Sequence, residues 1–221
     1  MNNVAFIKDK IKNTEVLFFD LDGTLIDTEP LYCRFWKEAC LFYGFELSDE
    51  QVLTLRSRDH QSTMEFLTKI SGGTLDYALT RAKRIELMDE YLKTHPIQIK
   101  EGAIEFLTSL KQQNKKLYIV SANTVEKCER TIKPLELAKY FDGIISANDV
   151  KRGKPFPDVY LKASDHVHRF PSEIVVFEDS PNGLKSASDA GCFVVMVEDL
   201  TSHNDKLNYV DGVISSFTEL L

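Results

Sequence analysis

The stretch VLFFDLDGT at residues 16–24 runs four apolar residues directly into a pair of aspartates. Other short apolar runs have the same continuous, β-branched or aromatic character: LYIV at 117–120, IVVF at 174–177, FVVMV at 193–197 and, more weakly, GIIS at 143–146. Continuous runs of this length are typical of parallel strands buried on both faces. Helical patterns lie between them, for example at 124–133, 156–166 and 181–190. The alternation predicts an α/β fold with a doubly wound, Rossmann-like parallel sheet.

One interval interrupts the alternation of strands and helices. Between about Pro30 and His95 there is no strand-like run, and apolar residues recur at helical spacing. Ser48 and Gln51 form a capping-box pattern, and residues 74–93 form a long helical stretch. We therefore expect a helical cap domain at 30–96, inserted after the first strand of a catalytic core made of 1–29 and 97–221.

Composition excludes several classes of protein. The chain has 221 residues, of which 43% are hydrophobic, so a sizeable core is possible and a disordered chain is not expected. Lysine and arginine number 27 against 34 acidic residues, and the net charge of 27 − 34 = −7 disfavours nucleic-acid binding. No apolar run approaches the about 20 residues of a membrane span, and no signal sequence is evident. We expect a cytoplasmic monomer with no nucleic-acid or membrane partner and reduced cysteines.

Polar residues follow three of the apolar runs. Asp20 follows the first, Ser121 the second, and Glu178 with Asp179 the run at 174–177. Ligands of open parallel sheets bind in the crevice beyond the carboxyl ends of the strands. The sequence therefore predicts that these side chains converge at one edge of the sheet.

The acidic residues predict phosphoryl chemistry around a metal ion. Asp20, Asp22 and Asp179 would repel one another in a crevice, and a bound Mg²⁺ removes that repulsion while accepting substrate phosphate. Asp20 is then available as a nucleophile towards phosphorus, and Asp22 can exchange protons with the leaving oxygen and with water. An Asp-x-Asp-Gly sequence on its own is equally compatible with an ordinary turn.

Two further segments offer partners for a phosphate. Ser121-Ala122-Asn123 opens a helix, where a hydroxyl and backbone N–H groups can bind an anion, although serine and asparagine are also common helix caps. Lys154 lies on a loop stiffened by two prolines and can pair with Asp20 and a phosphoryl group, unless it is an ordinary solvated lysine.

These motifs together resemble those of the haloacid dehalogenase superfamily, and in particular its cap-bearing phosphatases similar to β-phosphoglucomutase. The resemblance rests on four segments that span nearly the whole chain: FFDLDGTLIDTEP at 18–30, VSAN at 120–123, RGKPFPD at 152–158 and VFEDSPNG at 176–183.

The resemblance implies a role for each residue of these motifs. Asp20 would become an aspartyl-phosphate and Asp22 would be the general acid/base, while Lys154 would neutralise the nucleophile and the phosphate. The phosphoryl oxygens would bind Ser121 and the backbone of Asn123. Mg²⁺ would bind Asp20, the Asp22 carbonyl and Asp179, with Glu178 as a direct or water-mediated support.

Specificity would come from the cap. Residues 55–61 read LRSRDHQ, and Arg56, Arg58 and His60 are the candidates to bind the leaving group. By the resemblance, a mutase similar to β-phosphoglucomutase carries histidine where this chain has Tyr32, and a phosphate-holding arginine where it has His60. Both departures weaken the mutase interpretation.

The first functional hypothesis is a Mg²⁺-dependent phosphatase of a small phosphorylated metabolite, in particular a sugar phosphate, acting through an aspartyl-phosphate. The second is a phosphohexose mutase, which passes the phosphoryl group to another sugar hydroxyl. The third is a phospho-accepting receiver module. Such modules are single small domains of about 120 residues and have no helical insertion, which argues against this hypothesis.

Overall fold

The structure is a computed structural model, and it describes residues 4–55, 60–198 and 208–221. The chain divides into two compact units, which are described separately. The first, here called the core unit, contains residues 1–26 and 99–221, and the second, here called the helical unit, contains residues 27–98.

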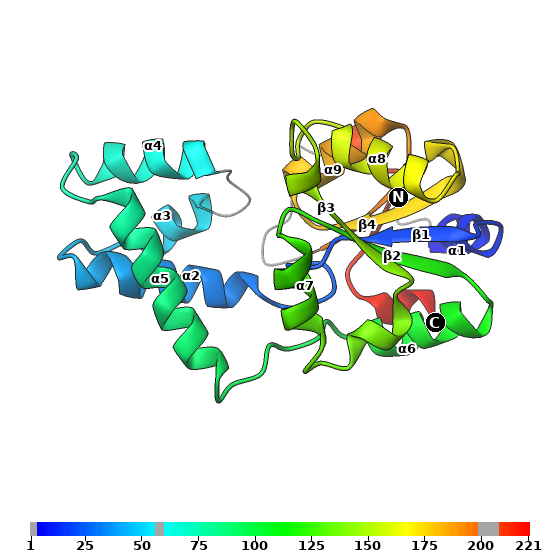
Figure 1. Ribbon diagram of the computed structural model, residues 1–221, viewed down its shortest axis with the longest axis horizontal. Helices are drawn as coiled ribbons and strands as arrows, with labels where there is room; N and C mark the ends of the chain where they lie inside the picture. The colour runs from blue at the N-terminus through cyan, green and yellow to red at the C-terminus, as the bar shows by residue number, and fades with distance from the viewer. Residues whose placement is uncertain (1–3, 56–59, 199–207) are drawn as a thin grey trace. The chain divides into compact units, whose positions relative to one another are not determined.

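The core unit is built on a six-stranded parallel sheet with the strand order β3-β2-β1-β4-β5-β6 (Figure 1). The strands are β1 (Val16–Phe19), β2 (Lys116–Ser121), β3 (Gly143–Ser146), β4 (Ile174–Glu178), β5 (Phe193–Val197) and β6 (Gly212–Ile214). Every neighbouring pair is parallel, which confirms the predicted α/β class. The sequence analysis did not predict β6, because three residues are too few to show a strand pattern.

Helices cover both faces of this sheet (Figure 1). They are α1 (Val4–Lys12), α6 (Ala103–Gln112), α7 (Val125–Ile132), α8 (Asp158–His166) and α9 (Pro181–Ala190), with the short 3-10 helices η1 (Leu137–Tyr140), η2 (Ala147–Asp149), η3 (Pro171–Glu173) and η5 (Phe217–Leu220). On one face, β1, β4 and β5 pack their alternate side chains against α8 and α9. Burial on both faces explains why the strands read as continuous apolar runs rather than alternating ones.

An aromatic cluster fills the other face. The rings of Phe19 and Phe177 stack with centroids 4.8 Å apart, and Phe106 of α6 meets Phe177 edge-on at 5.5 Å. Phe217 of η5 lies 5.5 Å from Phe106, so the last helical turn of the chain contributes to the same core. These contacts join β1, β4, α6 and η5, although the four elements lie far apart in the sequence.

The strand order reverses its direction beside β1. The chain moves outward from β1 to β2 and β3 and then returns to β4 on the other side of β1. Ligands of doubly wound sheets bind where the order reverses in this way. The backbone N–H of Asp20 donates to the carbonyl of Phe177 at 3.0 Å, which holds the end of β1 beside the end of β4.

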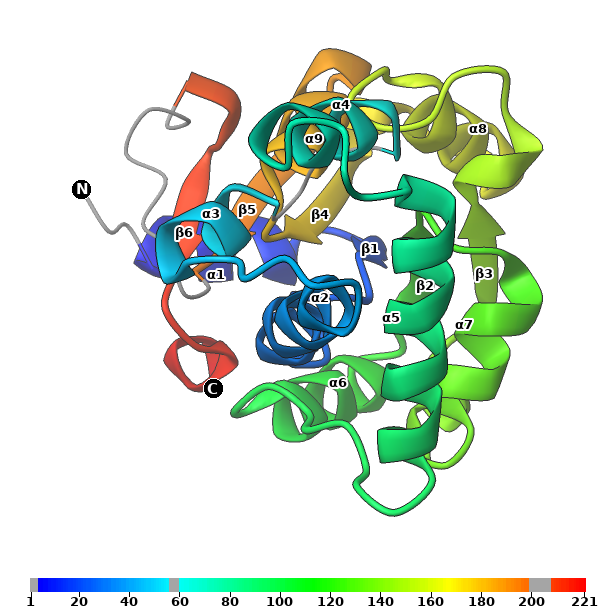
Figure 2. The ribbon, with the colours of Figure 1, turned by 90° about the vertical axis from the view of Figure 1, so that its left-hand side faces the viewer.

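The helical unit contains α2 (Glu29–Phe42), α3 (Asp49–Thr54), α4 (His60–Ile70) and α5 (Tyr77–Leu92), and its described residues form no strand. The axes of α2 and α5 cross where the two helices pack together (Figure 2). Ser48 and Gln51 form the predicted capping box at the start of α3. Within the described parts of the chain, no helix is long and apolar enough to cross a membrane.

The aromatic cluster generates a stability prediction. Phe217 is fully buried, so Phe217→Ala should lower the free energy of unfolding by about 3–5 kcal/mol through lost burial and an unfilled cavity. Phe170 is 76% exposed, and Phe170→Ala should change it by less than about 0.5 kcal/mol. Urea denaturation followed by circular dichroism measures both. Equal effects of the two substitutions would contradict the assignment of η5 to the core.

Candidate active site

Three buried carboxylates meet at the end of β1 and β4. Asp20 follows β1, Glu178 ends β4, and Asp179 comes next in the chain. One carboxylate oxygen from each lies within 4.8 Å of the others. Asp20 is 8%, Glu178 0% and Asp179 4% exposed, so water screens their charges poorly. The structure therefore brings together the acids that the sequence analysis placed at this edge.

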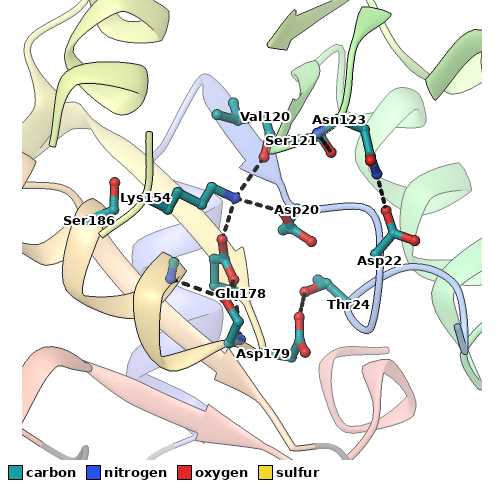
Figure 3. A network of polar contacts seen from close by, with 12 residues as sticks. Asp20, Asp22, Thr24, Val120, Ser121, Asn123, Lys154, Glu178, Asp179 and Ser186 are labelled. Atoms are coloured by element: carbon teal, nitrogen blue, oxygen red, sulfur yellow. Dashed lines mark hydrogen bonds and ion pairs between the residues drawn. The ribbon is translucent and has the colours of Figure 1, made fainter. Parts of the chain in front are cut away.

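Lys154 supplies the positive charge of this cluster (Figure 3). Its Nζ donates to Asp20 Oδ1 at 2.6 Å, to Glu178 Oε1 at 2.5 Å and to the carbonyl of Val120 at 3.0 Å. These acceptors use all three protons of the ammonium group. Ser186 of α9 donates to the carbonyl of Phe156 at 2.6 Å and thereby anchors the loop that carries Lys154. Lys154 is thus a fixed part of the site and not a solvated lysine.

Burial dominates the electrostatics of the cluster. Desolvation raises the pKa of Asp20 to about 8, against the attraction of Lys154 and with the help of repulsion from Glu178. Burial alone would lower the pKa of Lys154, but Asp20 and Glu178 hold it above its usual value. The lysine therefore stays charged, and Asp20 needs further positive charge nearby to be ionised at neutral pH.

The donor set fits a hard divalent cation. Three carboxylates face one ammonium group, which leaves a charge of −3 + 1 = −2 in a buried place if all of them are ionised. Thr24 Oγ donates to Asp179 Oδ1 at 2.7 Å and orients that carboxylate. A site that offers only oxygen ligands from a few carboxylates is typical of Mg²⁺.

Two glycines allow the acids to come this close. Gly23 has a positive φ of 86°, and a Cβ there would lie 2.3 Å from Asp179 Oδ2. A Cβ on Gly183 of α9 would lie 1.9 Å from Glu178 Oε1. The glycines of the DLDGT and SPNG segments therefore make room for the carboxylates, and any side chain at either position would displace one of them.

Tyr160 and Ser180 complete the environment of Glu178, and the sequence analysis missed both. The hydroxyl of Tyr160, fully buried in α8, donates to Glu178 Oε1 at 2.9 Å. The backbone N–H and hydroxyl of Ser180 lie 3.3 and 3.2 Å from Glu178 Oε2. In the sequence, Tyr160 resembles any apolar residue of an amphipathic helix, and only the packing of α8 on the sheet reveals its partner.

The second strand delivers its polar residues to the same edge. Ser121 is 2% exposed, Ala122 is exposed, and the backbone N–H of Asn123 donates to Ser121 Oγ at 3.1 Å. The Asn123 side chain donates through Nδ2 to Asp22 Oδ2 at 2.6 Å (Figure 3). The sequence analysis expected only the backbone of Asn123 to take part. The phosphate-binding role of this segment stays a prediction.

The predicted cap residues lie in a different unit. Arg56 and Arg58 fall outside the described residues. His60 begins α4 in the helical unit, is exposed, and places its ring edge-on to Tyr77 with centroids 4.7 Å apart. The role of all three in substrate binding therefore stays a prediction.

This combination of a parallel sheet, a helical insertion after its first strand and an acid–lysine centre defines a class of hydrolytic enzyme. A family model described as haloacid dehalogenase-like hydrolase matches residues 17–197. The chain belongs to this family, which confirms the resemblance seen in the sequence.

Individual relatives are similar over most of the chain. Hexitol phosphatase A of Escherichia coli is 32% identical over 91% of this chain and 91% of its own length. The phosphorylated carbohydrates phosphatase of Thermotoga maritima is 28% identical over 80% of this chain and 82% of its own. A crystal structure of β-phosphoglucomutase from Clostridium difficile shares the fold, with a TM-score of 0.77 and 19% identity over 94% of this chain and 93% of that one.

The charge imbalance of the cluster predicts metal binding that is measurable without turnover. Mg²⁺ should raise the melting temperature. A free Mg²⁺ concentration one hundred times its dissociation constant adds about 2.7 kcal/mol to the free energy of unfolding. Asp179→Asn should lose most of this stabilisation, because it removes one charged ligand. Asp189→Asn, which changes an exposed residue of α9, should keep it. Equal thermal shifts for the two variants would contradict the metal site.

Proposed function

We propose that this chain is a Mg²⁺-dependent phosphatase that hydrolyses a small phosphorylated metabolite, in particular a phosphorylated sugar or sugar alcohol. The observation that carries the proposal is the buried cluster in which Lys154 bonds to Asp20 and Glu178 beside Asp179. Membership of a hydrolase family and the names of the two phosphatase relatives support it.

The reaction has two steps. Asp20 attacks the phosphorus atom, its O–P bond forms, and the bond from phosphorus to the leaving oxygen breaks as Asp22 gives that oxygen a proton. Water then attacks the phosphorus atom of the aspartyl-phosphate while Asp22 takes a proton from that water. The Asp20 O–P bond breaks and phosphate is released. Lys154 donates to Asp20 Oδ1 and thereby orients the attacking carboxylate.

The charges of the cluster support this assignment. Asp20, Glu178 and Asp179 would hold the cation, which supplies positive charge to stabilise the phosphoryl oxygens and keeps Asp20 ionised. Lys154 neutralises charge on the nucleophile, while Ser121 and the backbone at Asn123 offer donors to the phosphoryl group.

We propose that the helical unit acts as a cap that contacts the leaving group, as predicted for Arg56, Arg58 and His60. The environment of Arg84 in α5 is an argument that this leaving group is polar. Arg84 is 9% exposed, and its guanidinium lies 4.8 Å from the ring centroid of Tyr32 and 5.1 Å from that of Trp36. Among the residues that the structure describes, its Nε has no hydrogen-bond partner. A buried cation with no ion pair in the described part of the chain suits an anionic or hydroxyl-rich group.

Phosphatase and mutase activity give different products from one substrate. With β-glucose 1-phosphate and Mg²⁺, we expect free phosphate and glucose, because the phosphoryl group passes to water. Glucose 6-phosphate as the main product would instead favour the mutase. Phosphate release and glucose 6-phosphate are each measured by a coupled assay, and a panel of about one hundred phosphorylated metabolites, ranked by kcat/KM, then defines specificity.

Two isosteric variants should fail at different steps. Asp20→Asn should fold normally and form no phosphoenzyme, because an amide is a poor nucleophile. Asp22→Asn should lower kcat by about 10²- to 10⁴-fold, the usual contribution of a general acid/base, and should accumulate phosphoenzyme when the leaving group is a good one. Rapid quench with an aryl phosphate, followed by intact-protein mass spectrometry, detects the intermediate. Near-native turnover of Asp20→Asn would overturn the mechanism.

A further inference from the structure

The side-chain amide of Asn123 lies between two charged groups of opposite sign. Its Nδ2 donates to Asp22 Oδ2 at 2.6 Å, and its Oδ1 accepts from Lys127 Nζ at 2.8 Å. An amide has one acceptor end and one donor end, so a cation on one side and a carboxylate on the other select a single orientation. The amide is therefore fixed with its N–H groups towards Asp22.

The backbone around Asn123 is also held in place. Its N–H donates to Ser121 Oγ at 3.1 Å, and its carbonyl accepts from the hydroxyl of Ser146, at the end of β3, at 2.7 Å. Two neighbouring strands, β2 and β3, therefore set the position of the residue before its side chain makes any contact. The side chain of Asn123 is thus presented to Asp22 from a rigid base.

Lys127 occupies a position where a positive charge is not favoured by the helix itself. Thr124 caps α7 by accepting from the N–H of Lys127, which lies in the first turn of the helix. The N-terminal end of a helix carries partial positive charge and favours acidic residues. Helix stability therefore does not account for this lysine, whereas its bond to Asn123 does.

We propose that Asn123 is a positioning residue that holds the Asp22 carboxylate through Oδ2, and that Lys127 keeps the Asn123 amide in the orientation this requires. The inference rests on the proposed acid/base role of Asp22 and deepens it. Asp22 projects from the turn after β1, and its carboxylate is not part of the cluster formed by Asp20, Glu178 and Asp179. The Asn123 amide, presented by β2, holds that carboxylate for proton transfer.

A direct contact between Lys127 and the substrate phosphate is the alternative explanation for this lysine. Such a contact would stabilise bound substrate, so its loss would raise KM and leave the step governed by Asp22 unchanged. A positioning pair has the opposite signature. Its loss lowers kcat and leaves KM nearly constant, and this effect on kcat requires Asp22 to be present.

The first experiment needs neither substrate nor metal. The Asn123 side-chain amide resonances, identified by their loss in Asn123→Ala, are followed by ¹H–¹⁵N NMR of the full chain. Asp22→Asn and Lys127→Met should each shift them, because each removes one charged partner. Lys133→Met is the matched control, since Lys133 is an exposed lysine at the other end of α7. Unchanged resonances in Asp22→Asn or in Lys127→Met would overturn the proposal.

The second experiment is a double-mutant cycle on steady-state turnover of 4-nitrophenyl phosphate with Mg²⁺. Asn123→Ala should lower kcat by about 10- to 100-fold, part of the range of general acid/base catalysis, with KM constant to within about threefold. Lys127→Met should lower kcat by a smaller factor, and Lys127→Arg should restore it. In the Asp22→Asn background, Asn123→Ala should lower kcat by less than a further factor of about three, because the two residues act as one unit.

Fully multiplicative effects of Asn123→Ala and Asp22→Asn would overturn the positioning role, and so would a Lys127→Met variant altered only in KM. If the unmodified protein released no phosphate from any substrate, the proposed function would fall and the catalytic part of this inference with it. The NMR responses would still decide whether Lys127 and Asn123 hold Asp22. The two failures are therefore distinguishable.

Discussion

The ammonium group of Lys154, enclosed between Asp20 and Glu178, is the interaction on which the rest of the site depends. Carboxylates this deeply buried repel one another and are costly to ionise, and removing a single partner from such a cluster leaves an uncompensated charge. Lys154 joins the ends of β1 and β4, and through the carbonyl of Val120 it also contacts β2. One side chain thus connects the ends of the three strands that form the candidate site.

The residues around the carboxylates fix the positions and orientations of Glu178 and Asp179. Gly23 and Gly183 leave the space into which Asp179 and Glu178 project, so backbone and carboxylate are in van der Waals contact where any Cβ would clash. Tyr160 and Ser180 donate further hydrogen bonds to Glu178 and orient its carboxylate. Each acid therefore has one orientation, which is the condition for holding a small cation and a phosphoryl group in register.

Sequence reasoning predicted part of this site because Asp20, Ser121 and Glu178 each directly follow a continuous apolar run. Asp20, Ser121 and Glu178 could be placed at one edge of a parallel sheet from their positions alone, and the structure has them there. Reasoning of the same kind did not identify Tyr160, because a tyrosine within an amphipathic helix has no distinctive pattern. It also missed the side-chain role of Asn123, whose partner Asp22 lies 101 positions away in the chain.

The order of apolar runs and helical stretches by itself determined the α/β class, the helical insertion and the edge of the sheet that carries the acids, because these follow from local periodicity and from the direction of parallel strands. Only the tertiary structure decided which oxygen meets which donor. It set the three acceptors of Lys154, the contact of Asn123 with Asp22 and the packing of Phe217 beneath β1 and β4. Such contacts depend on the packing of helices against the sheet, and no pattern of neighbouring residues encodes that packing.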